Sequence, residues 1–208
     1  MALGGMTMNK EDYLFYGAYA PILEIAENTV LEQIDAILKK NVNEGVHNPA
    51  EYIISRVKSA DSMKEKLVRK GMDTDVLSAI KQMNDTVGIR IVTHFIGDVY
   101  TISDYLKQSD AWTIEEIKDY ISNPKPNGYR SLHIILKMPL HGSELDFLPV
   151  EIQIRTIAMD CWASLEHQLK YKKNIPNADL IATELKRCSD EIASTDLSMQ
   201  TIREMLAK

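Results

Sequence analysis

In the stretch Gly88-Ile-Arg-Ile-Val-Thr-His-Phe95, mainly apolar side chains alternate with more polar ones at every second position, which is typical of a β-strand. One face of this strand would hold Ile89, Ile91, Thr93 and Phe95, and the other Arg90, Val92 and His94. The segments 112–121, 131–138 and 148–156 are also strand-like. The loop Asn123-Pro-Lys-Pro-Asn-Gly128 separates the first two of them. We therefore expect a β-sheet at the centre of the chain.

Helical periodicity surrounds this centre on both sides. It extends from about residue 9 to 40 with an interruption at Pro21, and Pro49 suits the first position of a short helix. Further helices are expected from Ser59 or Asp61 to Lys70 and over 73–83, 98–108, the residues after Thr156, and 178–206. The predicted fold class is α+β, a mixed sheet flanked by helices, with long amphipathic helices at both ends. We expect an N-terminal helical segment (1–48), a core (49–173) and a C-terminal helix (174–208) within one compact domain.

The composition excludes several classes of protein. The chain has 208 residues, of which 45 % are hydrophobic and 26 % charged, so disordered and low-complexity classes do not fit. No apolar run approaches the ~18 residues that a membrane span requires. The two cysteines, Cys161 and Cys188, lack the spacing of a redox or zinc motif. We expect a reduced, cytoplasmic protein that does not enter membranes.

The net charge of −6 argues against DNA binding and against general nucleic-acid binding, and no feature indicates an RNA site. One segment has the opposite charge. Between Arg56 and Lys70 lie six basic residues and two acids, Asp61 and Glu65, a local net charge of +4. On a helix, Ser62, Lys66 and Arg69 would share one face. The segment predicts a site for a small polyanion such as a triphosphate, with a solvated helix face as the alternative.

Two carboxylates form a second candidate site. Asp85 precedes the strand at 88–95, and Glu151 begins the stretch Glu-Ile-Gln-Ile-Arg155. Glu151, Gln153 and Arg155 would share one strand face, where unpaired charges are costly. Two carboxylates near phosphates suit Mg²⁺, which needs few protein ligands. The alternative is a structural Glu151–Arg155 ion pair.

The segment Lys125-Pro-Asn-Gly-Tyr-Arg-Ser-Leu-His133 is a third candidate. Tyr129 offers a face on which a base could stack, while Lys125, Arg130 and His133 offer hydrogen-bond donors. The alternative is an ordinary turn that leads into an edge strand. Farther along, Asp160 and Glu166 could reach a ligand from the start of a helix. Cys161 and His167 are poorly spaced for zinc.

Taken in order, these segments resemble a known family. The matching stretches are Arg56-Val-Lys58 with Ser62, Lys66 and Arg69, then Asp85 with Gly88 and Arg90, then Asn127-Gly-Tyr-Arg-Ser-Leu-His133, then Glu151-Ile-Gln-Ile-Arg-Thr156 with Ala158–His167. They resemble the RelA/SpoT-type (p)ppGpp synthetase domain in its stand-alone form, the small alarmone synthetase. The resemblance implies a nucleotidyltransferase-like fold and often a homotetramer. It implies transfer of the β,γ-pyrophosphate of ATP to the 3′-hydroxyl of GTP or GDP, with release of AMP.

The resemblance also implies roles for individual residues. Arg56 and Arg90 would sandwich adenine, and the ATP phosphates would be held by Lys58, Ser62, Lys66 and Arg69. Asp85 and Glu151 would bind Mg²⁺, with Glu151 also the base for the 3′-hydroxyl. GTP or GDP would be bound by Lys125, Tyr129, His133, Gln153 and Asp160. Two alternatives remain: a catalytically silent module that binds nucleotide or RNA, and an enzyme that attaches AMP to a protein or RNA.

Overall fold

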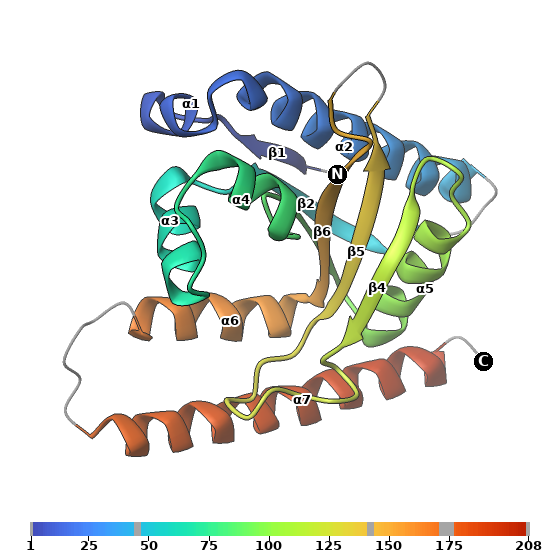
Figure 1. Cartoon of the computed structure of the whole chain (residues 1–208). Coiled ribbons are helices and arrows are strands. Elements are labelled where there is room, and N and C mark those ends of the chain that lie inside the picture. The colour runs from blue at the N-terminus through green and yellow to red at the C-terminus, as the bar shows by residue number, and fades with distance from the viewer. Residues whose placement is uncertain (1, 44–46, 141–143, 171–176, 207–208) are drawn as a thin grey trace.

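A six-stranded sheet organises the molecule in the computed structural model, which describes residues 2–43, 47–140, 144–170 and 177–206 (Figure 1). Its spatial order is β1-β2-β3-β6-β5-β4. β1 is parallel to β2 and β3 to β6, while the other neighbours are antiparallel. The predicted mixed sheet is thus confirmed. The strands are β1 (Ala2–Met6), β2 (Ala50–Val57), β3 (Val87–Thr93), β4 (Thr113–Asp119), β5 (Leu132–Pro139) and β6 (Phe147–Thr156).

The helices agree closely with the sequence periodicity. The first helical segment divides at Gly17, whose φ of 54° suits glycine, while Pro21 lies in the first turn of the next helix, where proline is tolerated. The helices are α1 (Lys10–Tyr16), the short 3₁₀ helix η1 (Gly17–Tyr19), α2 (Ala20–Asn43), α3 (Ala60–Arg69), α4 (Val76–Gln82), α5 (Ile96–Lys107), α6 (Ile157–Lys170) and α7 (Ala178–Leu206). No helix among these described residues is long and apolar enough to cross a membrane.

Two segments differ from the prediction. The short helix expected at Pro49 is wrong, because Ala50–Val57 forms strand β2. This strand lies between β1 and β3, so its backbone is paired on both sides. Ile53 and Ile54 are β-branched residues that suit a pleated sheet. Strand β1 was likewise not predicted from the sequence.

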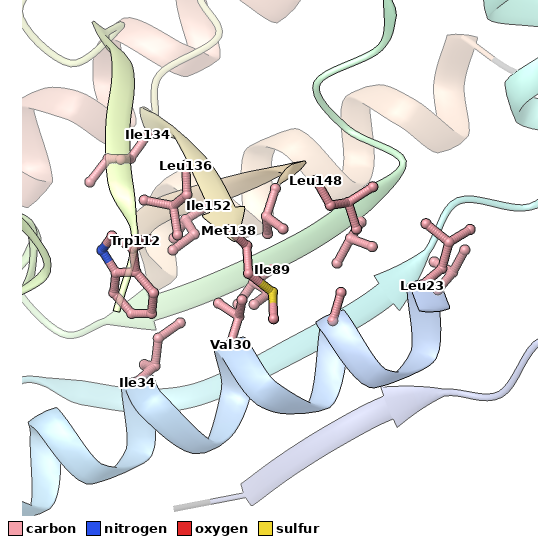
Figure 2. Close-up of a cluster of buried hydrophobic side chains, with 14 of the residues drawn as sticks. Leu23, Val30, Ile34, Ile89, Trp112, Ile134, Leu136, Met138, Leu148 and Ile152 are labelled. Atoms are coloured by element: carbon pink, nitrogen blue, oxygen red, sulfur yellow. The ribbon is translucent and has the colours of Figure 1, made fainter. Parts of the chain in front are cut away.

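The apolar face of the sheet forms the core. Ile53, Ile91 and Ile154 are fully buried in neighbouring strands. Helices α2 and α5 cover this face (Figure 1). Figure 2 shows Val30 and Ile34 of α2 pointing toward the sheet side chains. The alternate residues of the same strands therefore face the other side, where the polar residues gather.

Helix α7 runs across one end of the sheet and lies against α6 and α5 (Figure 1). Side-chain hydrogen bonds fix it there. The Thr156 hydroxyl at the end of β6 donates to Asp196 (2.5 Å), and Arg203 bonds Asp98 of α5 (2.7 Å). The second half of the last helix is thus bonded to the end of β6 and to α5.

The packing of α2 generates a stability prediction. Ile34 is fully buried, whereas Ile25 on the same helix is 63 % exposed. We expect Ile34→Ala to lower the free energy of unfolding by about 2–5 kcal/mol, because it removes buried methylenes and leaves a cavity. Ile25→Ala, the matched control, should change it by less than about 0.5 kcal/mol. Urea denaturation at neutral pH measures both, and equal losses would contradict the packing described.

Candidate active site

A row of polar side chains crosses the face of the sheet opposite the core. The strand register pairs Arg90 of β3 with Gln153 of β6, Gln153 with His133 of β5, and His133 with Lys118 of β4. Side chains at paired positions share a face, so these four lie side by side. The alternation predicted for Glu151, Gln153 and Arg155 is confirmed, because Ile152 and Ile154 are buried on the opposite face.

A cavity opens over this face at β2, β3 and β6. Six predicted site residues line it, and they come from three strands and the turns beside them. The lining residues are Ile54, Ser55, Arg56, Lys58, Asp85, Gly88, Ile89, Arg90, Glu151 and Gln153. The fold therefore brings the basic segment and the two carboxylates, which are far apart in sequence, into one place.

Asp85 is the anion at the basic end of the cavity. Its Oδ2 accepts from Lys58 Nζ (2.9 Å) and from Lys66 Nζ (2.6 Å). Burial raises the pKa of the Asp85 carboxyl, but the two ammonium groups lower it more, so the net shift is downward. Helix α1 supports this corner, because the Tyr16 hydroxyl donates to the Lys58 carbonyl (2.6 Å).

The basic face of α3 is only partly directed into the site. Lys66 reaches Asp85, in contrast to the alternative of a wholly solvated face. Ser62 and Arg69 are exposed and do not line the cavity over the described residues, and Ser62 accepts from the Ser59 hydroxyl (2.9 Å). Arg56 is also exposed, at the rim of the cavity.

Glu151 lies at the centre of the polar face. Its Oε1 is 3.1 Å from His133 Nδ1, and its Oε2 accepts from Gln153 Nε2 (2.6 Å). Burial raises the pKa of Glu151, but the hydrogen bonds from His133 and Gln153 and the nearby charge of His133 lower it more. The Glu151 carboxylate is thus held ionised, with its orientation fixed from two sides.

Arg155 is bonded to other residues than Glu151. Arg155 is 4 % exposed, and its guanidinium donates to Asp160 Oδ1 (3.1 Å), to Gln153 Oε1 (2.7 Å) and to the Tyr129 hydroxyl (2.6 Å). The expected alternative of a Glu151–Arg155 ion pair is therefore wrong. Arg155 is not among the site residues predicted from the sequence, although its place on the strand face with Glu151 was a usable signal.

Asp160 joins the two ends of the site. Besides Arg155, it binds Arg90 Nη1 (3.2 Å) and accepts from the Tyr52 hydroxyl (3.2 Å). Arg90 lines the cavity beside Asp85 and Glu151, whereas Arg155 contacts Tyr129. A carboxylate between two guanidinium groups allows Arg155 to remain buried and Arg90 to remain half-buried.

The loop after β4 contributes an aromatic and basic cluster. The Tyr129 hydroxyl lies 2.8 Å from His133 Nε2, and Lys125 Nζ lies 4.8 Å from the Tyr129 ring centroid and 4.6 Å from that of Tyr120. Burial lowers the pKa of Lys125. Two further residues belong to this cluster and were not predicted from the sequence. Lys118 lies near the end of β4, and Tyr120 directly follows the strand. The predicted residues of this loop are thus close to Glu151 on the side away from Asp85.

The pairing of Asp85 gives a test. Lys66→Ala should raise the pKa of the Asp85 carboxyl, which ¹³C NMR titration measures, whereas Lys64→Ala, on the exposed side of α3, should leave it unchanged. The pKa of Asp85 is lower in the fold than its unfolded value of about 3.9. The ion pairs of Asp85 therefore stabilise the fold above about pH 3.9. This stabilisation is lost as the pH falls through the pKa that Asp85 has in the folded protein. An unchanged Asp85 pKa in Lys66→Ala would contradict the pairing.

Comparison with known proteins gives consistent matches. Residues 55–176 match the family model described as a region found in RelA / SpoT proteins. The chain is 43 % identical to GTP pyrophosphokinase YwaC of Bacillus subtilis over 159 residues, which cover 76 % of each chain. It is 38 % identical to GTP pyrophosphokinase YjbM of the same organism over 160 residues, 76 % of this chain and 74 % of that one.

A solved structure matches the fold over almost its whole length. The crystal structure of small alarmone synthetase 1 from Bacillus subtilis, bound to its product pppGpp, has a TM-score of 0.81 and 32 % identity. The match covers 91 % of this chain and 96 % of that one. The family resemblance in the sequence is confirmed, and the chain belongs to the RelA/SpoT family.

Proposed function

We propose that this enzyme transfers the β,γ-pyrophosphate of ATP to the 3′-hydroxyl of GTP or GDP, forming (p)ppGpp and AMP. The observation that carries the proposal is the position of Glu151, between the Asp85–Lys58–Lys66 cluster and the Tyr129–His133–Lys125 cluster. One side offers cations for a triphosphate, and the other an aromatic ring and donors for a second nucleotide. The names of the relatives, GTP pyrophosphokinases, agree with this reaction.

ATP is proposed to bind over β2, β3 and α3. Arg56 and Arg90 both line the cavity, and their planar guanidinium groups suit stacking on adenine. Lys58 and Lys66 would bind phosphate oxygens of ATP, either in place of their ion pairs with Asp85 or in addition to them. Ser62 and Arg69, which are exposed on α3, the helix that also carries Lys66, would bind the outer phosphates of ATP.

The acceptor nucleotide is proposed to bind at the β4–β5 loop. Tyr129 would stack on guanine. Lys125 Nζ and Arg155 Cζ lie 4.8 and 5.0 Å from the centroid of its ring, so the base would take the place of one of these cations over the ring. Lys125 and His133 would hold the acceptor phosphates, and Gln153 and Asp160 would border the site. His133 reaches Glu151 as well, so it links acceptor binding to the central carboxylate.

Two carboxylates suit Mg²⁺ here. Asp85 Oδ1 is buried with no hydrogen-bond partner in the described part of the chain, and both Asp85 and Glu151 line the cavity. No group of three or more metal-binding side chains is found over the described ranges. This fits Mg²⁺, which takes one or two carboxylates and completes its shell with water and phosphate oxygens. When bound, it would neutralise charge on the phosphates.

The proposed transfer is a single displacement at the β-phosphorus of ATP. The acceptor 3′-oxygen attacks the β-phosphorus of ATP and forms a new P–O bond. The bond from that phosphorus to the α,β-bridging oxygen breaks, and AMP leaves with the electron pair. The proton of the 3′-hydroxyl passes to the ionised Glu151 carboxylate. Lys58 and Lys66 stabilise charge on the transferred group, so positioning and electrostatics supply most of the catalysis.

Glu151→Gln tests the central role. We expect transfer to fall at least about a hundredfold, because the amide can neither accept the proton nor bind Mg²⁺ as a carboxylate does. Glu65→Gln, a change of the same type on the exposed surface of α3, is the control and should keep full activity. The assay follows γ-labelled ATP with GTP or GDP and compares labelled guanosine nucleotide with AMP.

Other outcomes of that assay identify the alternatives. Nucleotide binding without any AMP from the wild-type enzyme would indicate a silent binding module. Release of pyrophosphate in place of AMP would indicate transfer of AMP to another acceptor. Full activity of Glu151→Gln would overturn the assignment of this residue.

A homotetramer in the cytoplasm is also proposed. The support for self-association is the second half of α7, where apolar side chains are more than half exposed: Leu197, Met199, Ile202, Met205 and Leu206. Light scattering at micromolar concentration should give a mass above that of a monomer. Ile202→Asp should lower this mass, while Thr195→Asp, an exposed polar position of the same helix, should not. A monomeric wild-type protein would contradict the proposal.

A further inference from the structure

The loop that carries Lys125 and Tyr129 rests on the last helix. The Ser189 hydroxyl of α7 donates to the Gly128 carbonyl (2.5 Å), and Ser189 is 3 % exposed. Figure 1 shows the segment between β4 and β5 lying along α7. A residue 61 positions away in sequence therefore holds the peptide that immediately precedes Tyr129.

Gly128 makes this close approach possible. Its φ is +92°, in the region that favours glycine. A Cβ added there would lie 2.7 Å from Ser189 Cβ and 3.4 Å from the Cα of Lys186. The loop backbone thus lies directly on the surface of α7, and its position is set by the helix.

Contacts on both sides of Gly128 fasten the same loop. Asn127 Nδ2 donates to Glu166 Oε1 of α6 (3.0 Å), and Asn127 Oδ1 accepts from the Tyr129 amide (3.2 Å). Arg130 donates from Nη1 to the Ile121 carbonyl (3.1 Å) and from Nη2 to Asp190 of α7 (3.4 Å). Tyr129 therefore lies between Asn127, which is bonded to α6, and Arg130, which is bonded to α7.

Helix α7 is itself anchored to the strand that carries Glu151. Trp162 Nε1 of α6 donates to the Leu185 carbonyl, one turn before Ser189 (2.9 Å). Asp196, two turns after Ser189, accepts from Thr156 at the end of β6. The path from Ser189 to the polar face thus runs through hydrogen-bonded, buried groups, and the helix can serve as a fixed support.

We propose that Ser189 is a positioning residue for the guanosine nucleotide that accepts pyrophosphate. It acts through the Gly128 carbonyl, which holds the loop so that Tyr129 and Lys125 face Glu151. This inference rests on the proposed function, because it assigns the loop to the acceptor. ATP binds at the opposite end of the site and does not depend on this contact.

Ser189→Ala tests the proposal, with initial rates measured against each nucleotide in turn. We expect the KM for GTP or GDP to rise about fivefold, the size expected for the loss of one neutral hydrogen bond. The KM for ATP should stay within twofold of the wild-type value. Ser198→Ala is the matched control, because its exposed hydroxyl bonds only the Ser194 carbonyl of its own helix among the described contacts. It should change neither KM.

Asp190→Asn provides a second variant if Ser189→Ala does not fold. Asp190 is exposed, so its replacement is tolerated by the fold, and the loss of its negative charge weakens the contact with Arg130. It should raise the acceptor KM in the same selective way. An unchanged acceptor KM, or an equal rise for both nucleotides, in the variant that folds would overturn the proposal. Failure of the proposed function is distinct, because the wild-type enzyme would then form no labelled guanosine nucleotide.

Discussion

The structure depends on the alternation of side chains along its central strands. On β6, Ile152 and Ile154 face the core under α2 and α5, while Glu151, Gln153 and Arg155 face the opposite side. A strand offers both faces at once because successive side chains point in opposite directions. One segment of ten residues therefore closes the hydrophobic core and supplies the central acid of the site. A shift of register by one residue would bury the charges and expose the isoleucines.

The charged face is stable because its charges are paired with each other. Asp85 lies between Lys58 and Lys66, Asp160 between Arg90 and Arg155, and Glu151 beside His133. Removal of one member of such a group would leave a buried charge uncompensated, which is costly. The same pairing orients the groups before any ligand arrives. A preorganised set of charges is what a pyrophosphoryl transfer requires, because most of its catalysis is electrostatic.

The residues after the sheet complete the site. Helix α6 supplies Asp160 and holds Asn127 through Glu166, and α7 holds Gly128 through Ser189. The β4–β5 loop has hydrogen bonds of its own, such as those that join Lys125 with Gly128 and Tyr129, and the two helices fix its position relative to the sheet. The match to small alarmone synthetase 1 extends over 91 % of the chain, beyond the segment 55–176 that matches the family model. Both terminal helices thus belong to the shared architecture.

The sequence by itself determined the elements whose signal is local. The strand around Ile89 and Ile91, the helix at 178–206 and the chemistry of Asp85 and Glu151 follow from periodicity and residue type, which neighbouring positions carry. The tertiary structure alone decided which distant residues meet. It made Ala50–Val57 a strand by pairing it on both sides, bonded Arg155 to Asp160 and Tyr129 and left Glu151 to His133 and Gln153, and placed Ser189 on Gly128. These outcomes depend on contacts between segments far apart in the chain, and no local pattern encodes such contacts.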